Sequence, residues 1–301
     1  MHLNRLVLLG VPIWYGDGRV DDLLEEAIRN GFKYVEISFD YPWPFSYDEL
    51  IIRRILDLKE SYSLDIGIHA PWRDLSLASP HDKLRLASLK VMKNCINVAG
   101  SLEAHYLNFH IFTNELVEYP EVYDKVMESA KKSLKAIERF CLEVGIKPVV
   151  ENNPVIFLGG VNQFKKLLEE DTVACICLDI GHAIVANELF AKRKYIKDVS
   201  SIESWLNEFR DRIFLIHLHD CKKIGGRLED HYLLGEGTLD LLEILKEVLL
   251  STNARYVLLE MFKSTNLSRK VLIEDLSKVA TRITEALGDI CVFGGVQNNS
   301  S

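Results

Sequence analysis

The chain has 301 residues, of which 48% are hydrophobic, and a formal net charge of −8. This length accommodates one barrel domain of about 250 residues with extensions. The acidic balance argues against a nonspecific nucleic-acid binder, because affinity for DNA comes largely from Lys and Arg that neutralise phosphates. No run of residues approaches the ~18 consecutive apolar residues of a membrane span, and residues 1–10 lack the long apolar core of a signal peptide. We therefore expect a soluble, cytoplasmic protein without a membrane partner.

The first half of the chain alternates short apolar runs with segments of helical period. Apolar runs bounded by turn residues indicate buried strands, and apolar residues three and four apart indicate helices. The first helix is expected to stop at Asn30-Gly31, a usual C-terminal signal. Strands are expected at 6–11, 34–39, 64–70 and 105–111, and helices at 21–28, 47–62, 80–99 and 123–145.

The second half repeats this alternation. Strands are expected at 148–152, 175–179, 213–220 and 255–262, and helices at 161–170, in a stretch up to about 209, at 239–250 and at 267–287. A polar loop through 235–237 is expected after the strand at 213–220. Strands this uniformly apolar are typical of a parallel sheet covered on both faces. The alternation predicts a single α/β domain, a (β/α)8 TIM barrel over 1–290, followed by a flexible tail at 291–301.

Polar side chains that can bind a metal stand at the ends of these strands. In CICLDIGH, at 175–182, an apolar strand ends in Asp179, turns at Gly181 and continues to His182. The other strand-end residues of this kind are Glu36, His69, His110, Glu151, His217, His219 and Glu260. In a TIM barrel the C-terminal ends of all strands face one mouth, so these side chains should converge there. Several carboxylates and imidazoles would repel one another or need shifted pKa values without a cation, which predicts at least one catalytic divalent metal.

The strings HAPWRDLSLASP, LNFHIFTN, ENNP, CLDIGH, HLHDCK and EDHYLLGEG carry a resemblance. They resemble the xylose isomerase-like barrel superfamily, which includes sugar isomerases and epimerases, related dehydratases, and abasic-site DNA repair enzymes of the endonuclease IV type. The resemblance covers nearly the whole chain. In the isomerase and epimerase branch it implies one metal, held by Glu151, Asp179, His217 and Glu260. Zn²⁺ or Mn²⁺ suits such a mixed set of ligands, with Mg²⁺ and Co²⁺ left open.

In the endonuclease branch, the resemblance implies three zinc ions. Besides the set just named, it places a second ion among His69, His110 and Glu151. A third ion would lie among His182, His231 and an acid, which is Glu229 here where that branch has Asp. All of these positions carry side chains that can be ligands. The histidines among them can also serve as polar contacts of the barrel mouth.

Departures from the endonuclease pattern favour a sugar or sugar phosphate as the substrate. The loop SFDYPWPFSYDE is aromatic and acidic, where the endonucleases have a polar and basic loop. Glu151 is followed by NNPVIFLGG and not by the Thr-Ala-Gly pattern of the repair enzymes, and Glu36 is typical of the sugar branch. The favoured function is aldose-ketose isomerisation or epimerisation through an enediolate, with Glu151 and Glu260 as metal-bound acid and base. Substrate contacts are expected from Glu36, Trp72, His182, Lys222 and Arg227, with a further hydrogen bond from His69.

Two alternatives stay open beside the isomerase. One is zinc-dependent hydrolysis of a phosphodiester at abasic DNA sites, and only this alternative makes DNA a partner. The other is a noncatalytic ligand-binding barrel, which would be expected to have lost one of its four central ligands. Among the remaining residues, His219 is expected to contact Asp220, and the six Cys are expected to be buried or incidental thiols. The sequence leaves a homo-oligomer open.

Overall fold

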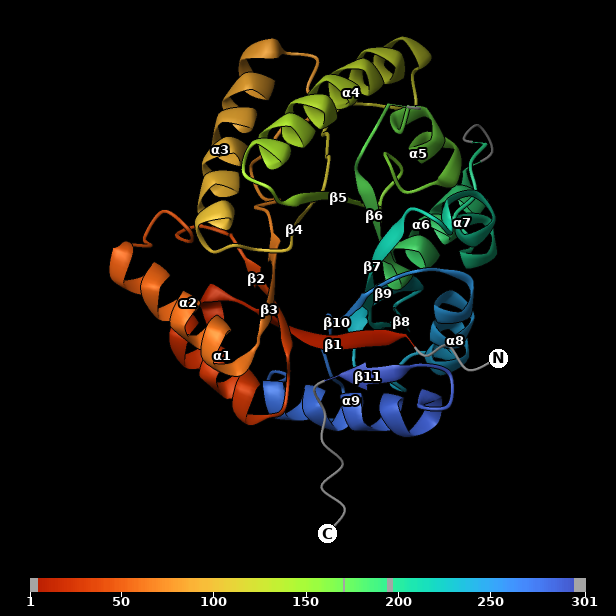
Figure 1. Cartoon of the computed structure of the whole chain (residues 1–301). Coiled ribbons are helices and arrows are strands. Elements are labelled where there is room, and N and C mark those ends of the chain that lie inside the picture. The colour runs from red at the N-terminus through yellow and green to blue at the C-terminus, as the bar shows by residue number, and fades with distance from the viewer. Residues whose placement is uncertain (1–4, 170, 194–196, 295–301) are drawn as a thin grey trace.

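Eight parallel strands close into a barrel, which confirms the predicted (β/α)8 TIM barrel (Figure 1). The computed structural model describes residues 5–169, 171–193 and 197–294. Each barrel strand pairs with the next one along the chain, and β10 pairs with β1 to complete the circle. The barrel strands are β1 (Leu6–Ile13), β2 (Tyr34–Ser38), β3 (Asp65–His69), β4 (Tyr106–Phe109), β5 (Lys147–Glu151), β6 (Cys175–Asp179), β7 (Ile213–Leu218) and β10 (Tyr256–Leu259).

Helices surround the barrel and bury one face each against the strands (Figure 1). They are α1 (Val20–Arg29), α2 (Glu49–Tyr62), α3 (Asp82–Ser101), α4 (Pro120–Glu143), α5 (Val161–Leu167), α6 (Ile180–Lys192), α7 (Ile202–Phe209), α8 (Leu241–Ser251) and α9 (Ile273–Leu287). In α1 the buried residues are Val20, Leu23, Leu24 and Ala27, the spacing of one helical face. None of the helices in the described part of the chain is long and apolar enough to cross a lipid bilayer.

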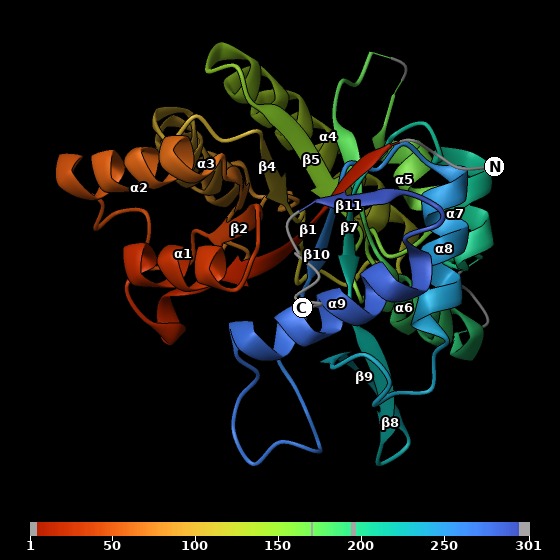
Figure 2. The same cartoon turned by 60° about the horizontal axis from the view of Figure 1, so that its bottom comes forward.

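The structure differs from the sequence prediction in the polar segment that follows β7. Strand β7 ends at Leu218, and an antiparallel hairpin of β8 (Asp220–Ile224) and β9 (Arg227–Tyr232) follows where a polar loop was expected. Its turn contains Gly225 and Gly226, both at positive φ. The sequence did not predict these two strands, because charged residues occupy most of the hairpin and no alternation of apolar and polar residues marks it. The hairpin projects from the same end of the barrel as the loop between β10 and α9 (Figure 2).

Three further boundaries differ from the prediction. The expected helical stretch up to 209 is two helices, α6 and α7, and residues 194–196 between them lie outside the described residues. Helix α9 begins at Ile273, several residues after the predicted start. The domain continues beyond residue 290, because β11 (Val292–Gly294) pairs in parallel with β1. The rest of the expected tail, 295–301, lies outside the described residues.

Large polar aromatic side chains fill the inside of the barrel. Tyr34, Tyr106 and Tyr256 are buried there and pack on one another, with ring centroids 4.6 to 6.4 Å apart. Two glycines make the room: a Cβ on Gly10 would lie 2.0 Å from Cδ1 of Tyr34, and one on Gly67 would lie 2.2 Å from Cζ of Tyr106. The interior therefore combines close packing with buried hydroxyl groups.

Replacing Gly67 by Ala tests this packing. The new methyl group would meet the Tyr106 ring inside a closed barrel, so the ring or the strand must shift. We expect Gly67→Ala to lower the free energy of unfolding by about 1–3 kcal/mol, measured by denaturant titration. The control is Gly16→Ala, because a Cβ on Gly16 meets nothing within 4 Å. Equal stability of the two variants would contradict the packing account.

Candidate active site at the mouth of the barrel

A cavity of about 440 Å³ opens at the C-terminal ends of the barrel strands. Aromatic and proline side chains form much of its wall, and acids and histidines form its floor. The lining residues are Pro12, Trp14, Glu36, Ser38, His69, Trp72, His110, Phe112, Pro154, His182, Asp230, His231, Glu260, Phe262 and Lys263. The strand-end side chains predicted from the sequence therefore lie in or directly beneath one cavity.

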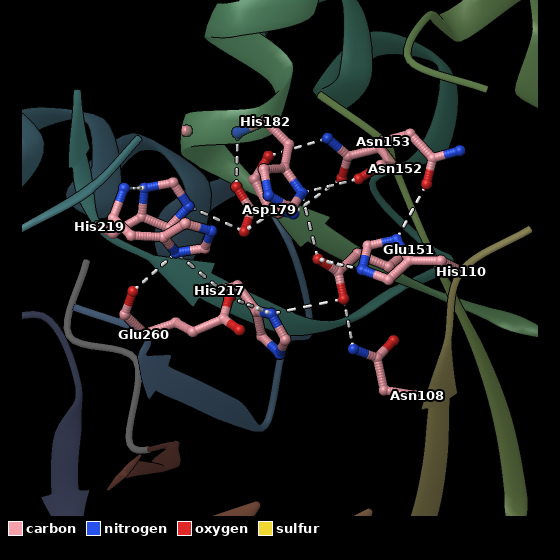
Figure 3. A network of polar contacts seen from close by, with 12 residues as sticks. Asn108, His110, Glu151, Asn152, Asn153, Asp179, His182, His217, His219 and Glu260 are labelled. Carbon is pink, nitrogen blue, oxygen red and sulfur yellow. Dashed lines mark hydrogen bonds and ion pairs between the residues drawn. The ribbon is translucent and has the colours of Figure 1, made fainter. Parts of the chain in front are cut away.

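Glu151, at the end of β5, lies at the centre of the polar network beneath the cavity (Figure 3). Its carboxylate oxygens lie 3.5 Å from His69 Nε2, 3.4 Å from His110 Nε2 and 3.5 Å from His217 Nδ1. Asn108 donates a hydrogen bond to the same carboxylate. Figure 3 shows Asn108 on one side of the Glu151 carboxylate and His182 on the other. One carboxylate is thus shared by several imidazoles.

A four-residue group surrounds the position that the resemblance assigns to a metal. Glu151, Asp179, His217 and Glu260 each offer a ligand atom within 4.8 Å of the others. His217 Nδ1 faces the carboxylates, at 3.0 Å from Glu260 Oε2. Cys177, with Glu151 and His217, forms an overlapping group of three residues. Burial raises the pKa of the Cys177 thiol well above its ordinary value, so Cys177 is a protonated thiol and the three carboxylates are the stronger donors.

The histidines around this group have fixed orientations. Nδ1 of His69 lies 2.8 Å from the carbonyl oxygen of Ala70, and Nδ1 of His231 lies 3.0 Å from that of Glu260. Nδ1 of His182 lies 3.1 Å from the carbonyl oxygen of Asn152. A carbonyl oxygen only accepts hydrogen bonds, so each Nδ1 carries the proton. When such a ring is neutral it therefore presents the lone pair of Nε2, as metal-binding histidines held by an outer hydrogen bond do.

His110 is oriented in the same way by Asn153. The amide nitrogen of Asn153 donates to the carbonyl oxygens of Ile111 and Phe157, so its Oδ1 faces His110 Nδ1 at 2.9 Å. Burial lowers the pKa of His110 to about 4, so the ring is neutral and its Nε2 is a bare acceptor. That acceptor lies 3.4 Å from Glu151 Oε1, a buried oxygen without a hydrogen-bond donor. Two lone pairs face each other here, and a divalent cation fits between such groups.

Further buried atoms of this cluster lack a hydrogen-bond partner. They are both ring nitrogens of His217 and Oε2 of Glu260. Mixed nitrogen and oxygen donors of this kind suit Zn²⁺, Mn²⁺ or related ions. The residues present therefore fit a divalent metal, which would be held by Glu151, Asp179, His217 and Glu260. A second group, His69, His110 and Glu151, shares the Glu151 carboxylate with the first.

The carboxyl groups of this cluster are ionised. Burial alone would raise their pKa values, but the surrounding imidazoles outweigh burial and lower the pKa of Asp179 and of Glu260 to about 2. The same balance holds the pKa of Glu151 well below its ordinary value. Burial alone would lower the pKa of His69 and of His182, but the carboxylates raise them to about 9 and about 10. The metal-free cluster is thus held together by protons that a cation would replace.

The structure corrects the expectation for Glu229. The third predicted group has His182 and His231 close together, with His219 as its other member. Glu229 points away: its Oε2 accepts from the Tyr232 hydroxyl at 3.3 Å and lies 3.8 Å from Lys263. Neighbouring side chains of a strand face opposite sides, so Asp230 lines the cavity in its place. His231 also reaches the cavity because its φ of 63° interrupts the alternation.

His219 holds Asp179, not Asp220. Its Nε2 lies 3.0 Å from Asp179 Oδ2, and its Nδ1 accepts the backbone N–H of His231 at 2.9 Å. Both ring nitrogens are therefore used, which makes His219 an orienting residue for the Asp179 carboxylate. Asp220 instead accepts the backbone N–H groups of Cys221, Gly235 and Gly237.

The expected substrate-binding residues divide into two sets. Glu36, Trp72 and His182 line the cavity. Lys222 and Arg227 lie on the β8–β9 hairpin, outside the cavity lining, and Lys222 donates a hydrogen bond to the Thr265 hydroxyl at 2.8 Å. The expectation that these two cations contact a substrate in the cavity is therefore not supported.

The sequence analysis did not identify the asparagines that orient the candidate ligands, and it did not identify two residues of the cavity wall. Asn108 and Asn153 orient Glu151 and His110, and Asn152 bonds the backbone N–H of Asp179 at 2.8 Å. Their signal was present in LNFH and ENN, because each Asn lies within two residues of a predicted ligand. Lys263 and Phe262 also line the cavity, directly after the strand-end residues Glu260 and Met261.

Comparison with known proteins places the chain in a family. The model of the xylose isomerase-like TIM barrel family matches residues 24–282, so the chain belongs to this family. An uncharacterised protein of Methanocaldococcus jannaschii, MJ1614, is 27% identical over 74% of this chain and 79% of its own length. A probable endonuclease 4 of Aquifex aeolicus is 26% identical over 69% of this chain and 74% of its own length.

A solved structure shares the fold. The crystal structure of a D-tagatose 3-epimerase-like protein superposes with a TM-score of 0.71 over 94% of this chain and 99% of that chain, at 18% identity. The likeness confirms the barrel architecture.

Metal binding should compete with protons at this site. Because the pKa values of His69 and His182 are raised to about 9 and about 10, both rings are protonated at neutral pH beside a carboxylate that would hold the metal. We expect the apparent affinity for Zn²⁺ or Mn²⁺ to rise with pH up to these values, with protons released on binding. Isothermal titration calorimetry in buffers of different ionisation enthalpy measures both quantities.

The same shifts set the pH dependence of the metal-free protein. The folded pKa values lie above the ordinary 6.5, so the stability they contribute is fully present below 6.5 and is lost as pH rises through about 9 and about 10. We expect the melting temperature of the metal-free protein to fall in that range, and the melting temperature of the metal-loaded protein to fall less. A binding reaction without proton release would contradict this account.

Proposed function

We propose that this protein is a divalent-metal-dependent enzyme that isomerises or epimerises a sugar or sugar phosphate. The observation that carries the proposal is the position of Glu260. Its carboxylate lines the cavity and also lies 3.0 Å from His217 Nδ1, within the four-ligand group. One carboxylate can therefore reach both the metal position and the substrate. Proton abstraction next to a metal-polarised carbonyl requires such a group.

The shape of the cavity supports a small ligand. Its volume of about 440 Å³ lies within the range of small-molecule sites. Trp14 and Trp72 line its wall, and because Arg73 lies over both rings, a sugar would meet the parts of these rings that Arg73 leaves open. His69 and His182 offer polar groups on the floor. The formal net charge of −8 disfavours binding to an extended polyanion.

The two proposed acid-base residues differ in access. Glu260 faces the cavity, so we assign to it the proton transfer on the side of the incoming substrate. Glu151 is 1% exposed and lies beneath the histidines, so it serves as the inner carboxylate of the pair. A bound divalent cation would polarise the carbonyl and hydroxyl oxygens of the substrate. His182 and His69 would hydrogen-bond substrate hydroxyls from the floor of the cavity.

A second candidate function is the metal-dependent hydrolysis of a phosphodiester at an abasic DNA site. The observation in its favour is that donor groups exceed what one metal needs. The group of His69, His110 and Glu151 lies beside the four-ligand group. His182 and His231 lie close together on the other side of the network, where His219 is already occupied by Asp179 and the His231 backbone. Similarity to probable endonuclease 4 sequences points the same way. Several metals together can activate water and stabilise a leaving oxygen.

Deuterium exchange tests the proposal before the substrate is known in detail. Ketoses, aldoses and their phosphates are incubated with metal-loaded protein in D2O, and NMR measures deuterium at the carbon next to the carbonyl. We expect exchange with at least one sugar. Glu260→Gln should lower its rate by about 10²–10⁴-fold while metal stays bound, because the group that moves the proton is lost. Glu151→Gln should lower metal content as well.

Glu229→Gln is the matched control for these two variants. Glu229 is an acid of the same mouth, but its side chain is 43% exposed and turned away from the cluster, so exchange should stay at the wild-type rate. Elemental analysis and an incision assay on a duplex with one abasic site complete the experiment. About three zinc ions per chain together with incision and no exchange would replace the isomerase with the hydrolase.

A further inference from the structure

A chain of buried polar groups runs from the middle of the barrel to His217. The hydroxyl groups of Tyr34 and Tyr106 hydrogen-bond each other, and Tyr106 donates to Glu36 Oε2 at 2.5 Å. Glu36 Oε1 lies 3.3 Å from His217 Nε2, while Nδ1 of the same ring faces Glu260 at 3.0 Å. Tyr34, Tyr106, Glu36 and His217 are at most 2% exposed. The strands β2, β4 and β7 thus supply one connected row of side chains.

The hydroxyl groups need an explanation beyond packing. Phe at positions 34 and 106 would fill nearly the same space that Gly10 and Gly67 leave open. A buried hydroxyl is costly unless it is hydrogen-bonded, so an apolar ring is the simpler filling for a barrel interior. Here the Tyr106 hydroxyl is directed at a carboxylate, and that carboxylate is directed at a histidine.

The groups around the His217 ring favour one tautomer. A neutral imidazole carries one proton, so Nδ1 can be a metal ligand only when Nε2 holds that proton. The Tyr106 hydroxyl occupies Glu36 Oε2, and Glu36 Oε1 lies 3.3 Å from His217 Nε2, a buried nitrogen that makes no hydrogen bond in this structure. The row therefore places an acceptor beside Nε2 and leaves the Nδ1 lone pair toward Glu151 and Glu260.

We propose that Glu36 and Tyr106 are positioning residues that set the ring orientation and tautomer of His217 and thereby the metal affinity of the site. This inference rests on the metal-dependent function proposed above. In this inference Glu36 acts by orienting His217, whereas the sequence analysis expected Glu36 to contact the substrate. Carboxylates that receive the outer N–H of a metal-binding histidine typically raise metal affinity by about 10–100-fold.

Cys177 does not replace Glu36 in this role. The Cys177 Sγ lies within 4.8 Å of a His217 ring nitrogen and of Glu151. A thiol is a weak acceptor, whereas a carboxylate is a strong one, so Nε2–H is better satisfied by Glu36.

The test compares two isosteric changes inside the same barrel. Tyr106→Phe removes the hydroxyl that holds Glu36, and Tyr256→Phe removes a hydroxyl that donates to Asp65 at 2.8 Å. Mn²⁺ and Co²⁺ affinities of metal-stripped protein are measured by calorimetry, and the Co²⁺ absorption spectrum reports the ligand set. We expect Tyr106→Phe to weaken binding by about tenfold and alter the spectrum, and Glu36→Gln to weaken binding by about 10–100-fold. Tyr256→Phe should match the wild type.

The outcomes separate this inference from the proposed function. If wild-type protein binds Mn²⁺ or Co²⁺ and Tyr106→Phe binds it as Tyr256→Phe does, the positioning role is overturned while the metal site stands. If the wild type binds no divalent ion, both the metal-dependent function and this inference are overturned. Should Glu36→Gln fail to fold, Tyr106→Phe still decides the question, since it changes neither charge nor shape beyond one oxygen.

Discussion

A buried carboxylate with an oxygen that receives no hydrogen bond is the constraint on which the barrel mouth depends. Glu151 is 1% exposed, and its Oε1 faces the bare Nε2 of His110 at 3.4 Å. Burying an ionised carboxylate costs several kcal/mol unless opposite charge compensates it. Protons on His69 and His182 supply part of that charge without a metal, and a cation among the donors would supply all of it. The fit of this cluster to a divalent cation thus rests on electrostatics as much as on the arrangement of the donors.

The parallel register of the sheet makes this concentration of charge possible. Asp179 pairs with His217 across β6 and β7, and Glu151 pairs with Cys177 across β5 and β6. Strands in register end at the same level, so acids and histidines far apart in the chain meet at one end. The helices outside and the tyrosines inside hold the strands in that register. Most of this stabilising material lies away from the cavity, although His182 in the first turn of α6 lines it.

The sequence predicted the barrel and most of the floor, because both depend on where apolar runs end. Asp179, His182 and Glu151 each close or follow a run that only a strand explains, and parallel strands determine where such residues meet. Glu229 shows the limit of this reasoning. Alternation along β9 is broken at His231 by a positive φ, which no period of apolar residues reveals in so polar a hairpin.

The role of Glu36 was beyond the sequence for a related reason. Its partners Tyr106 and His217 lie on strands β4 and β7, and the room for Tyr106 depends on Gly67 on β3. Contacts that cross a barrel interior leave no local pattern. By contrast, Asn108, Asn152 and Asn153 each lie within two residues of a predicted ligand in the sequence, so they could have been included among the candidates.

The wall of the cavity is a connected row of aromatic rings with one guanidinium group. Arg73 lies over the rings of both Trp14 and Trp72, at 5.2 and 4.4 Å from their centroids, and pairs with Asp40. The row of ring contacts continues from Trp14 to Phe262 and His231, and from Trp72 to Phe112 and His110. Both ends of this row therefore rest on histidines of the floor. The wall of the cavity is thus held by histidines that also lie beside the candidate metal ligands, so the shape of the cavity and the arrangement of the donors depend on each other.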